Sequence, residues 1–338
     1  AGLFMYGCHD INDLDKYPKP DWLAGKLYTQ LSVQENLSQF AGCLRRVGFD
    51  TILDVSGSFT IFAPSNEAIN AFLAENNYST IEAIPLPVLE EIVKFHIIQD
   101  AWSVGQLQTL DLTGWIDPTD EESEPRAYKR QTLLKNPNEK YWVKPKGTGY
   151  AIVDSTFATG YKRVYTRSRK YVPIFFDEYL NIFNLSGNDY TFYFDRPFEP
   201  GTVYYGEAKV DQDEIFAENG FIYVIDRVVD AMLNGHELLE RNLPGETYNT
   251  FLELINQFPE FRSNLEETYN QVEAREGLNF DTLYNLSFPK LPFDLHEEMT
   301  GPSYSFSNYT YLYQNGIYVP TDDAFERFID EVLTVNSG

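Results

Sequence analysis

Residues 60–68 read Thr-Ile-Phe-Ala-Pro-Ser-Asn-Glu-Ala and predict a buried strand that passes directly into a helix. The first three residues are β-branched or aromatic, which suits the pleated surface of a sheet. Pro64 cannot donate a hydrogen bond to a neighbouring strand, so the strand is expected to end there. Ser65 is a favourable N-cap, because its hydroxyl can accept a hydrogen bond from an amide of the first helical turn.

The same pattern returns near the C-terminal end of the sequence. Residues 318–325 read Tyr-Val-Pro-Thr-Asp-Asp-Ala-Phe, with Pro320 and Thr321 in the places of the earlier proline and cap. The offset is 256 residues at successive positions (320 − 64 and 324 − 68). Similarity at a fixed offset indicates an internal repeat. The sequence therefore predicts one module and the opening of a second.

Two further segments lie between the copies. Residues 95–98 read Phe-His-Ile-Ile, and residues 219–229 read Asn-Gly-Phe-Ile-Tyr-Val-Ile-Asp-Arg-Val-Val. Together with residues 60–68, they resemble three ordered signatures of the fasciclin (FAS1) family over about Lys26 to Leu233. The resemblance implies an α+β fold, with a fasciclin-like β-sheet core, packed helices, a large insertion in the first module and the start of a second.

The segment around His96 carries two open interpretations. His96 stands between Phe95 and Ile97, which favours a buried histidine that is hydrogen-bonded to the backbone. In the fasciclin family this segment has been tied to adhesion, so the resemblance also implies a recognition role. Phe95 replaces the tyrosine of the family pattern.

Boundaries of the signatures predict three parts of the chain. Residues 1–25 are expected to be a signal remnant and tether, residues 26–235 a first fasciclin-like domain, and residues 236–338 a partial second domain. The first domain is longer than a typical module, and its surplus is expected at about residues 110–205.

Charge is distributed unevenly along the chain. The whole sequence has 26 basic and 51 acidic residues and a net charge of −25, which argues against nonspecific binding to nucleic acid. Residues 126–171 contain 12 Lys/Arg and 2 Asp/Glu, a local charge of 12 − 2 = +10. Two interpretations stay open: solvated loops that balance nearby acids, or a docking face for an acidic partner. The docking interpretation singles out Lys162, Arg163, Arg167 and Arg169.

Tyr and Phe are concentrated in residues 171–205. Residues 190–194 read Tyr-Thr-Phe-Tyr-Phe and are interpreted as a short strand with aromatic rings on both faces. Such rings can be covered by other elements, or they can form a platform for sugar rings or a protein partner. Tyr190 and Tyr193 are the candidate binding residues of this platform.

Cys8 predicts a lipid anchor. It follows a short apolar run, residues 3–7, and precedes several aspartates, which resembles the acylated cysteine and export signal of Bacteroidetes surface lipoproteins. A fortuitous apolar start and a Cys8–Cys43 bridge are the alternatives. Cys43 itself lies in an apolar stripe and is expected to be a core residue. The sequence has no apolar run long enough to span a membrane, so the N-terminal lipid would be the only attachment.

No catalytic motif, cofactor fingerprint or metal-ligand spacing is present in the sequence. We therefore expect a non-enzymatic lipoprotein on the cell surface, held at the outer membrane, without catalytic residues, cofactor, metal or nucleic-acid partner. Its expected partner is a surface polymer (glycan or peptide) or an outer-membrane protein such as a SusC/SusD-like uptake complex. A glycan-active hydrolase that uses the aromatic insertion as a cleft, and a purely structural surface protein, are the alternatives.

Overall fold

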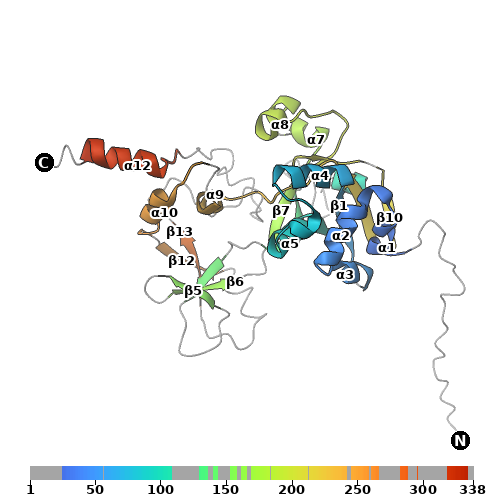
Figure 1. Cartoon of the computed structure of the whole chain (residues 1–338), viewed down its shortest axis with the longest axis horizontal. Coiled ribbons are helices and arrows are strands. Elements are labelled where there is room, and N and C mark those ends of the chain that lie inside the picture. The colour runs from blue at the N-terminus through green and yellow to red at the C-terminus, as the bar shows by residue number, and fades with distance from the viewer. Residues whose placement is uncertain are drawn as a thin grey trace, which may run out of the picture. The chain divides into compact units, whose positions relative to one another are not determined.

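The computed structural model describes residues 25–55, 57–108, 129–135, 140–143, 153–157, 161–165, 169–182, 184–211, 213–241, 245–258, 260–265, 282–287, 295 and 318–333. The chain divides into two compact units. The first contains residues up to 108 together with 185–228, and the second contains residues 109–184 together with 229–338. Helices and strands are both present in each unit, and the fold is α+β as the family resemblance implies (Figure 1).

The first unit begins with helices, and its strands lie far apart in the sequence (Figure 1). Its helices are α1 (Leu27–Ser32), η3 (Glu35–Leu37), α2 (Ser38–Arg46), α3 (Phe49–Val55), α4 (Asn66–Glu75), η4 (Ile81–Ala83), α5 (Leu86–Phe95), α6 (Val104–Leu107) and α8 (Gly187–Phe194). Its strands are β1 (Phe59–Pro64), β2 (Ile97–Gln99), β8 (Tyr204–Tyr205), β9 (Ala208–Lys209), β10 (Ile215–Ala217) and β11 (Gly220–Ile225).

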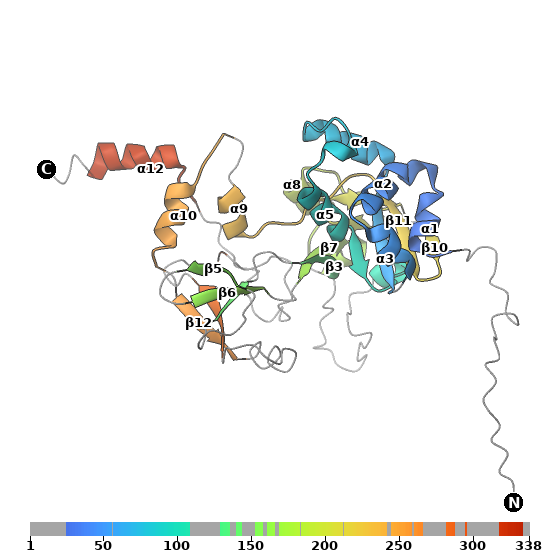
Figure 2. The ribbon, with the colours of Figure 1, turned by 60° about the horizontal axis from the view of Figure 1, so that its bottom comes forward.

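Strand β1 lies in the interior of a sheet, in the part with the strand order β10-β11-β1-β2. It pairs in parallel with β11, from Phe59 opposite Gly220 to Pro64 opposite Ile225, and antiparallel with β2. Strand β1 is buried from Thr60 to Pro64, because it has a neighbour on each side and helices packed against it (Figure 2). The apolar composition of residues 60–63 matches this burial.

Aromatic rings fill the core beside β1. Phe62 stacks on Tyr205 with 4.1 Å between ring centroids and on Tyr223 with 5.6 Å. Tyr205 is fully buried, and its hydroxyl donates a hydrogen bond to the carbonyl of Phe95 at the end of α5. Burial raises the pKa of Tyr205 well above its usual value, so the hydroxyl stays protonated and remains a donor.

The pair Asn219–Gly220 closes the first unit. The Asn219 side chain accepts a hydrogen bond from Leu27 N at 3.0 Å and donates to Leu53 O at 2.9 Å, so it joins the start of α1 to the end of α3. Gly220 lies against β1 so closely that a Cβ there would be 1.8 Å from Phe59 O. Only glycine allows this approach of the two backbones.

Residues 190–194 form a helix, and the strand interpretation is wrong. They lie in α8, where Ser186 and Asp189 form a reciprocal capping box at the N-terminus. The helical spacing also brings Tyr190 and Phe194 together, with 4.8 Å between ring centroids. The high β-propensity of aromatic residues is thus overridden by the cap and by packing of one helical face.

Strands of the insertion and of the C-terminal third belong to the second unit. Its strands are β3 (Lys129–Lys135), β4 (Lys140–Val143), β5 (Val153–Phe157), β6 (Tyr161–Tyr165), β7 (Arg169–Phe175), β12 (Glu260–Asn264) and β13 (Leu283–Ser287). Its helices are α7 (Asp177–Ile182), α9 (Gly235–Arg241), α10 (Asn249–Ile255) and α12 (Asp322–Phe328), followed by a π-helical turn η5 (Ile329–Leu333).

The sheet of the second unit explains why its boundaries differ from the expected domains. Strands β3 and β7 pair antiparallel, and five further strands form a sheet with the order β12-β13-β4-β6-β5. Within it Leu283 pairs with Val143 and Tyr284 with Trp142. Strands from the insertion and from residues 260–287 therefore complete one sheet, which sequence order alone does not indicate.

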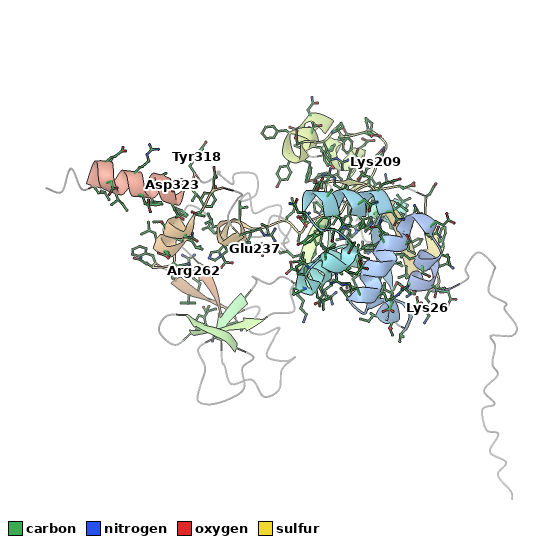
Figure 3. All side chains as sticks on the ribbon, in the orientation of Figure 1. Lys26, Lys209, Glu237, Arg262, Tyr318 and Asp323 are labelled. Carbon is green, nitrogen blue, oxygen red and sulfur yellow. The ribbon has the colours of Figure 1, made fainter. Side chains whose placement is uncertain are left out.

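The second copy of the repeat lies at the start of α12. The Thr321 side chain accepts a hydrogen bond from Ala324 N at 3.3 Å. The next residue, Asp322, accepts hydrogen bonds from the amides of Asn249 and Thr250 at the N-terminus of α10. Figure 3 marks Tyr318 and Asp323 on either side of this cap. None of the described helices is both long and apolar enough to cross a bilayer.

Candidate functional site

Helix α8, called the α8 cap below, is anchored to the rest of the first unit by Tyr190. The Tyr190 side chain is buried, and its hydroxyl donates a hydrogen bond to Gly206 O at 3.1 Å. Burial, with the nearby Tyr204 next in effect, raises the pKa of Tyr190, so its hydroxyl stays protonated and keeps this bond. Tyr190 therefore holds the cap in place and is not an exposed contact residue.

Rings continue from this anchor to the surface of the cap. Tyr190 contacts Tyr204 and Phe194 with 4.8 Å between centroids in each pair, and Phe194 contacts Tyr193 at 4.8 Å. Tyr193 is 52% exposed and Phe192 is 92% exposed. Two aromatic side chains are thus presented to solvent, and Tyr193 rests on the packed rings through Phe194.

Asp189 shares the exposed face of α8 with these rings, since it precedes them by three and four residues. Its carboxylate accepts hydrogen bonds from Ser186 N and Ser186 Oγ, both at 2.7 Å. These bonds to Ser186 lower the pKa of Asp189 and keep it ionised. We call Asp189, Phe192 and Tyr193 the α8 ridge.

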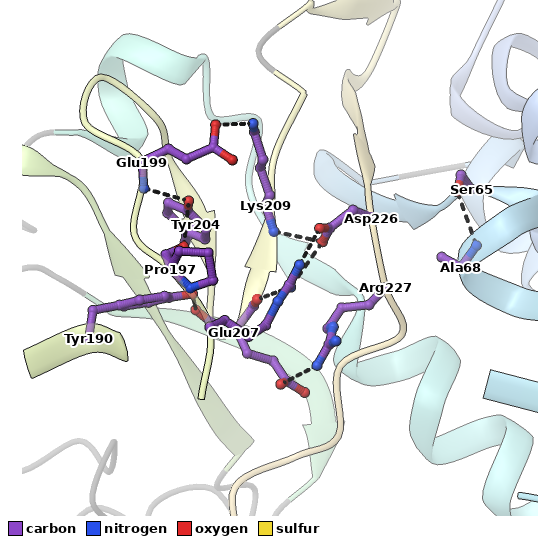
Figure 4. Close-up of polar contacts among 12 residues, drawn as sticks. Ser65, Ala68, Tyr190, Pro197, Glu199, Tyr204, Glu207, Lys209, Asp226 and Arg227 are labelled. Atoms are coloured by element: carbon purple, nitrogen blue, oxygen red, sulfur yellow. Dashed lines mark hydrogen bonds and ion pairs between the residues drawn. The ribbon is translucent and has the colours of Figure 1, made fainter. Parts of the chain in front are cut away.

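Ion pairs fix the segment that follows α8 to the end of β11 (Figure 4). Arg196 pairs with Asp226 at 2.6 Å and also donates to Glu207 O at 2.7 Å. Arg227 pairs with Glu207 at 2.7 Å. In Figure 4 the Lys209 side chain binds Glu199, and the Lys209 backbone amide donates to Asp226. The Asp226 carboxylate therefore binds both β9 and Arg196. The cap is therefore attached by charged contacts as well as by aromatic packing.

The structure places His96 in the core of the first unit. Its side chain is fully buried, with Nδ1 2.7 Å from Ile92 O and the ring 5.9 Å from that of Phe40. Burial lowers the pKa of His96 to about 4, so the ring is neutral at neutral pH and donates from Nδ1 to the carbonyl. A surface partner cannot contact this side chain while the core is intact.

The residues of the predicted basic docking face come from two strands. Lys162 and Arg163 lie in β6, and their side chains are outside the described part of the structure. Arg169 begins β7 and is partly buried, and Arg167 lies outside the described residues. Among the insertion residues whose side chains the structure describes, Phe192 is the most exposed aromatic residue. The strand interpretation did not single it out.

Of the two cysteines, the structure describes Cys43. Cys43 is a free, buried thiol in α2, and burial raises its pKa to about 12. It is a core residue of the helix layer. Cys8 lies outside the described residues.

Comparison with known proteins gives a family match. The model of the fasciclin domain matches residues 35–144, a range that contains β1, α4, α5 and His96. Residues 35–144 match a fasciclin domain. The first two signatures lie in this range, and the strand of the third, β11 (Gly220–Ile225), lies outside it and pairs with β1.

Two relatives match a short part of the chain. Stabilin-1 of Homo sapiens is 39% identical over 77 residues, which is 23% of this chain and 3% of that protein. Stabilin-1 of Mus musculus is 37% identical over 77 residues, with the same coverage. The matched segment therefore spans a very small part of these relatives. Among solved structures, a FAS1 domain pair from the insect cell adhesion molecule fasciclin I has 16% identity and a TM-score of 0.29, and the match covers 71% of this chain and 63% of that one.

Proposed function

We propose that this protein is a non-enzymatic adhesion or nutrient-capture accessory of the cell surface. The observation that carries the proposal is the fasciclin-domain match over residues 35–144. Its partner would be a surface polymer, glycan or peptide, or an outer-membrane protein such as a SusC/SusD-like uptake complex. The protein would act through contact alone, without a cofactor.

The α8 ridge is the proposed contact surface of this module. Its rings are exposed, and Tyr193 packs through Phe194 on the buried Tyr190. The ion pairs of Arg196 and Arg227 fix the segment that follows the helix. A rigid aromatic surface loses little conformational entropy when it binds, which favours recognition. Surplus chain on a stable domain is also where binding surfaces commonly lie.

Attachment to the outer membrane would come from an acyl group on Cys8. Replacement Cys8→Ser removes the acceptor of the lipid, so the protein should leave the membrane fraction and appear as a soluble species. Fractionation together with mass spectrometry of the N-terminal peptide measures this. A Cys8→Ser variant that stays in the outer membrane, with no acyl group on the parent, contradicts the anchor.

Retention of envelope material by the immobilised protein tests the adhesion proposal. Outer-membrane fragments and a panel of glycans are passed over the parent, over the double variant Phe192→Ala/Tyr193→Ala, and over Phe216→Ala. Phe216 is 44% exposed on β10, outside the ridge, and serves as the matched control. The parent and the control should retain material, and the double variant should release it while its melting temperature stays unchanged.

Each other outcome has a definite meaning. No retention by the parent contradicts the adhesion proposal. Equal retention by the double variant removes the ridge from it. Shortened glycans in the effluent would show that the protein is an enzyme.

A further inference from the structure

We propose that the α8 ridge binds a partner segment that carries exposed lysine or arginine side chains. This inference rests on the proposed adhesion function and names the chemistry of its partner. It follows from three features of the described cap: exposed ring faces, ionised carboxylates beside them, and cations that are already paired with other acids.

The rings come first. Phe192 is 92% exposed and Tyr193 is 52% exposed. Tyr193 packs on Phe194, whose ring contacts the buried Tyr190. The face of an aromatic ring carries negative electrostatic potential and attracts a cation placed over it. Phe192 and Tyr193 lie on either side of Asp189, three and four residues along the helix, so the ridge can receive two neighbouring cationic side chains.

Acidic groups accompany the rings. Asp189 lies on the same face of α8, and its bonds to Ser186 hold it in the ionised form. Asp195 follows the helix directly as its C-cap and is exposed. A carboxylate next to a ring favours a cationic side chain over a neutral sugar, because the charge is attracted by both groups.

Nearby basic groups do not cancel this charge. Residues 185–201 contain three acids, Asp189, Asp195 and Glu199, and one base, Arg196. Arg196 is bound to Asp226, and Lys209 is bound to Glu199 (Figure 4). The charge that remains on the ridge itself is negative.

The charge of the whole chain acts in the same direction. Its net charge of −25 attracts a basic partner over long distances and repels an anionic polymer or an anionic membrane. Long-range attraction would raise the association rate, whereas the ridge would decide where the partner docks.

Binding of a short fluorescein-labelled peptide of alternating lysine and glycine, followed by anisotropy, tests the inference. The matched probe is the same peptide with every lysine acetylated, which keeps the length and removes the charge. The proteins are the full chain, Phe192→Ala/Tyr193→Ala, Asp189→Asn and Phe216→Ala. The side-chain oxygen of asparagine can still accept a hydrogen bond from Ser186 N, so Asp189→Asn removes charge with little effect on the helix.

The double variant should raise the Kd for the lysine peptide about 5- to 30-fold, the sum of two exposed cation–π contacts. Asp189→Asn should raise it about 2- to 5-fold, as expected for one exposed ion pair. The Phe216→Ala variant should bind as the parent does, and the acetylated peptide should bind none of the proteins.

Several results would overturn the inference. Equal binding by the parent and the double variant would mean that net charge alone attracts the peptide. Equal binding of the acetylated peptide would mean an apolar contact. Ridge-dependent binding to phosphatidylcholine vesicles, with ridge-independent binding of the peptide, would assign the rings to a lipid surface. If the parent protein still retains envelope fragments in any of these cases, the adhesion proposal stands. If the parent retains none but binds the lysine peptide through the ridge, the adhesion proposal is contradicted and the present inference is not.

Discussion

The two copies of the strand-to-helix pattern make the same local contacts in very different surroundings. Ser65 caps α4 through Ala68 N at 3.1 Å, and Thr321 caps α12 through Ala324 N at 3.3 Å. The residue after each cap then binds an earlier helix: Asn66 accepts from Gln39 N in α2 at 3.0 Å, and Asp322 accepts from Thr250 N in α10 at 2.7 Å.

Burial separates the copies. Residues 61–63 of the first copy are fully buried between β11 and β2. In the second copy Tyr318 is 99% exposed, and among the described residues no strand pairs with 318–320. The comparison teaches that nine residues encode the turn, the cap and the link to a preceding helix, whereas burial of the strand depends on partners supplied from distant parts of the chain.

Truncation of equivalent apolar positions should give the largest difference between the copies. Leu73 and Ile329 are related by the 256-residue offset (329 − 73), and their exposed fractions are 8% and 42%. Leu73→Ala should lower the free energy of unfolding by about 2–5 kcal/mol, because it leaves a cavity in the core. Ile329→Ala should change it by less than about 0.5 kcal/mol. Urea denaturation measures both, and equal losses would show that the second copy is as buried as the first.

Acid should destabilise the first unit through His96. Its pKa is about 4 in the folded protein and 6.5 in the unfolded chain, so the unfolded state binds the extra proton first as pH falls. The stability that the neutral ring gives is present above pH 6.5 and is lost as pH falls toward 4, by about 3 kcal/mol.

His96→Asn is the matched variant for this test, because the asparagine amide can still donate to Ile92 O and does not titrate in this range. Its unfolding free energy should vary less with pH between 6.5 and 4 than that of the parent. Identical pH profiles for the two proteins would assign the acid sensitivity to other groups.

Loss of a cap should have a smaller effect. Ser65→Ala removes the acceptor for Ala68 N, and we expect a loss of about 1 kcal/mol in the free energy of unfolding. Ser65→Asp, which keeps an acceptor, should stay close to the parent. The corresponding change Thr321→Ala should increase amide exchange at Ala324 without lowering the melting temperature of the first unit, because its cap belongs to the other unit.

Substitution of the residue after each N-cap should have the smallest effect on the free energy of unfolding and should change the pH dependence of amide protection most clearly. Hydrogen bonds, chiefly with Thr247 and Thr250, lower the pKa of Asp322. The ionised carboxylate therefore keeps its contact with α10 at pH values above the usual aspartate pKa. The contact weakens as pH falls through the lowered pKa of the folded state. Asn66 makes the equivalent contact without a titrating group. Asp322→Asn should therefore make the protection factor of the Thr250 amide independent of pH in acid, and Asn66→Asp should make the protection factor of the Gln39 amide depend on it. Unchanged profiles would mean that the two contacts are not equivalent.

Sequence by itself determined the local structure and the family. Pro64, Ser65 and the 256-residue offset predict the junction and its repeat, since proline and a hydroxyl cap act within a few residues of the backbone. The first two signatures likewise predict the family, since both lie in the range 35–144 that matches the fasciclin domain. Gly220 of the third signature lies opposite Phe59 of β1.

Tertiary structure alone decided which surfaces are exposed and which strands share a sheet. Residues 190–194 have the composition of a strand, yet a capping box and the burial of Tyr190 make them a helix that leaves Phe192 in solvent. Strand β6, which contains Lys162 and Arg163, pairs with β4, and β4 pairs in turn with the distant β13. Burial and strand pairing depend on contacts between residues far apart in the chain, so a pattern read over a few residues cannot contain them.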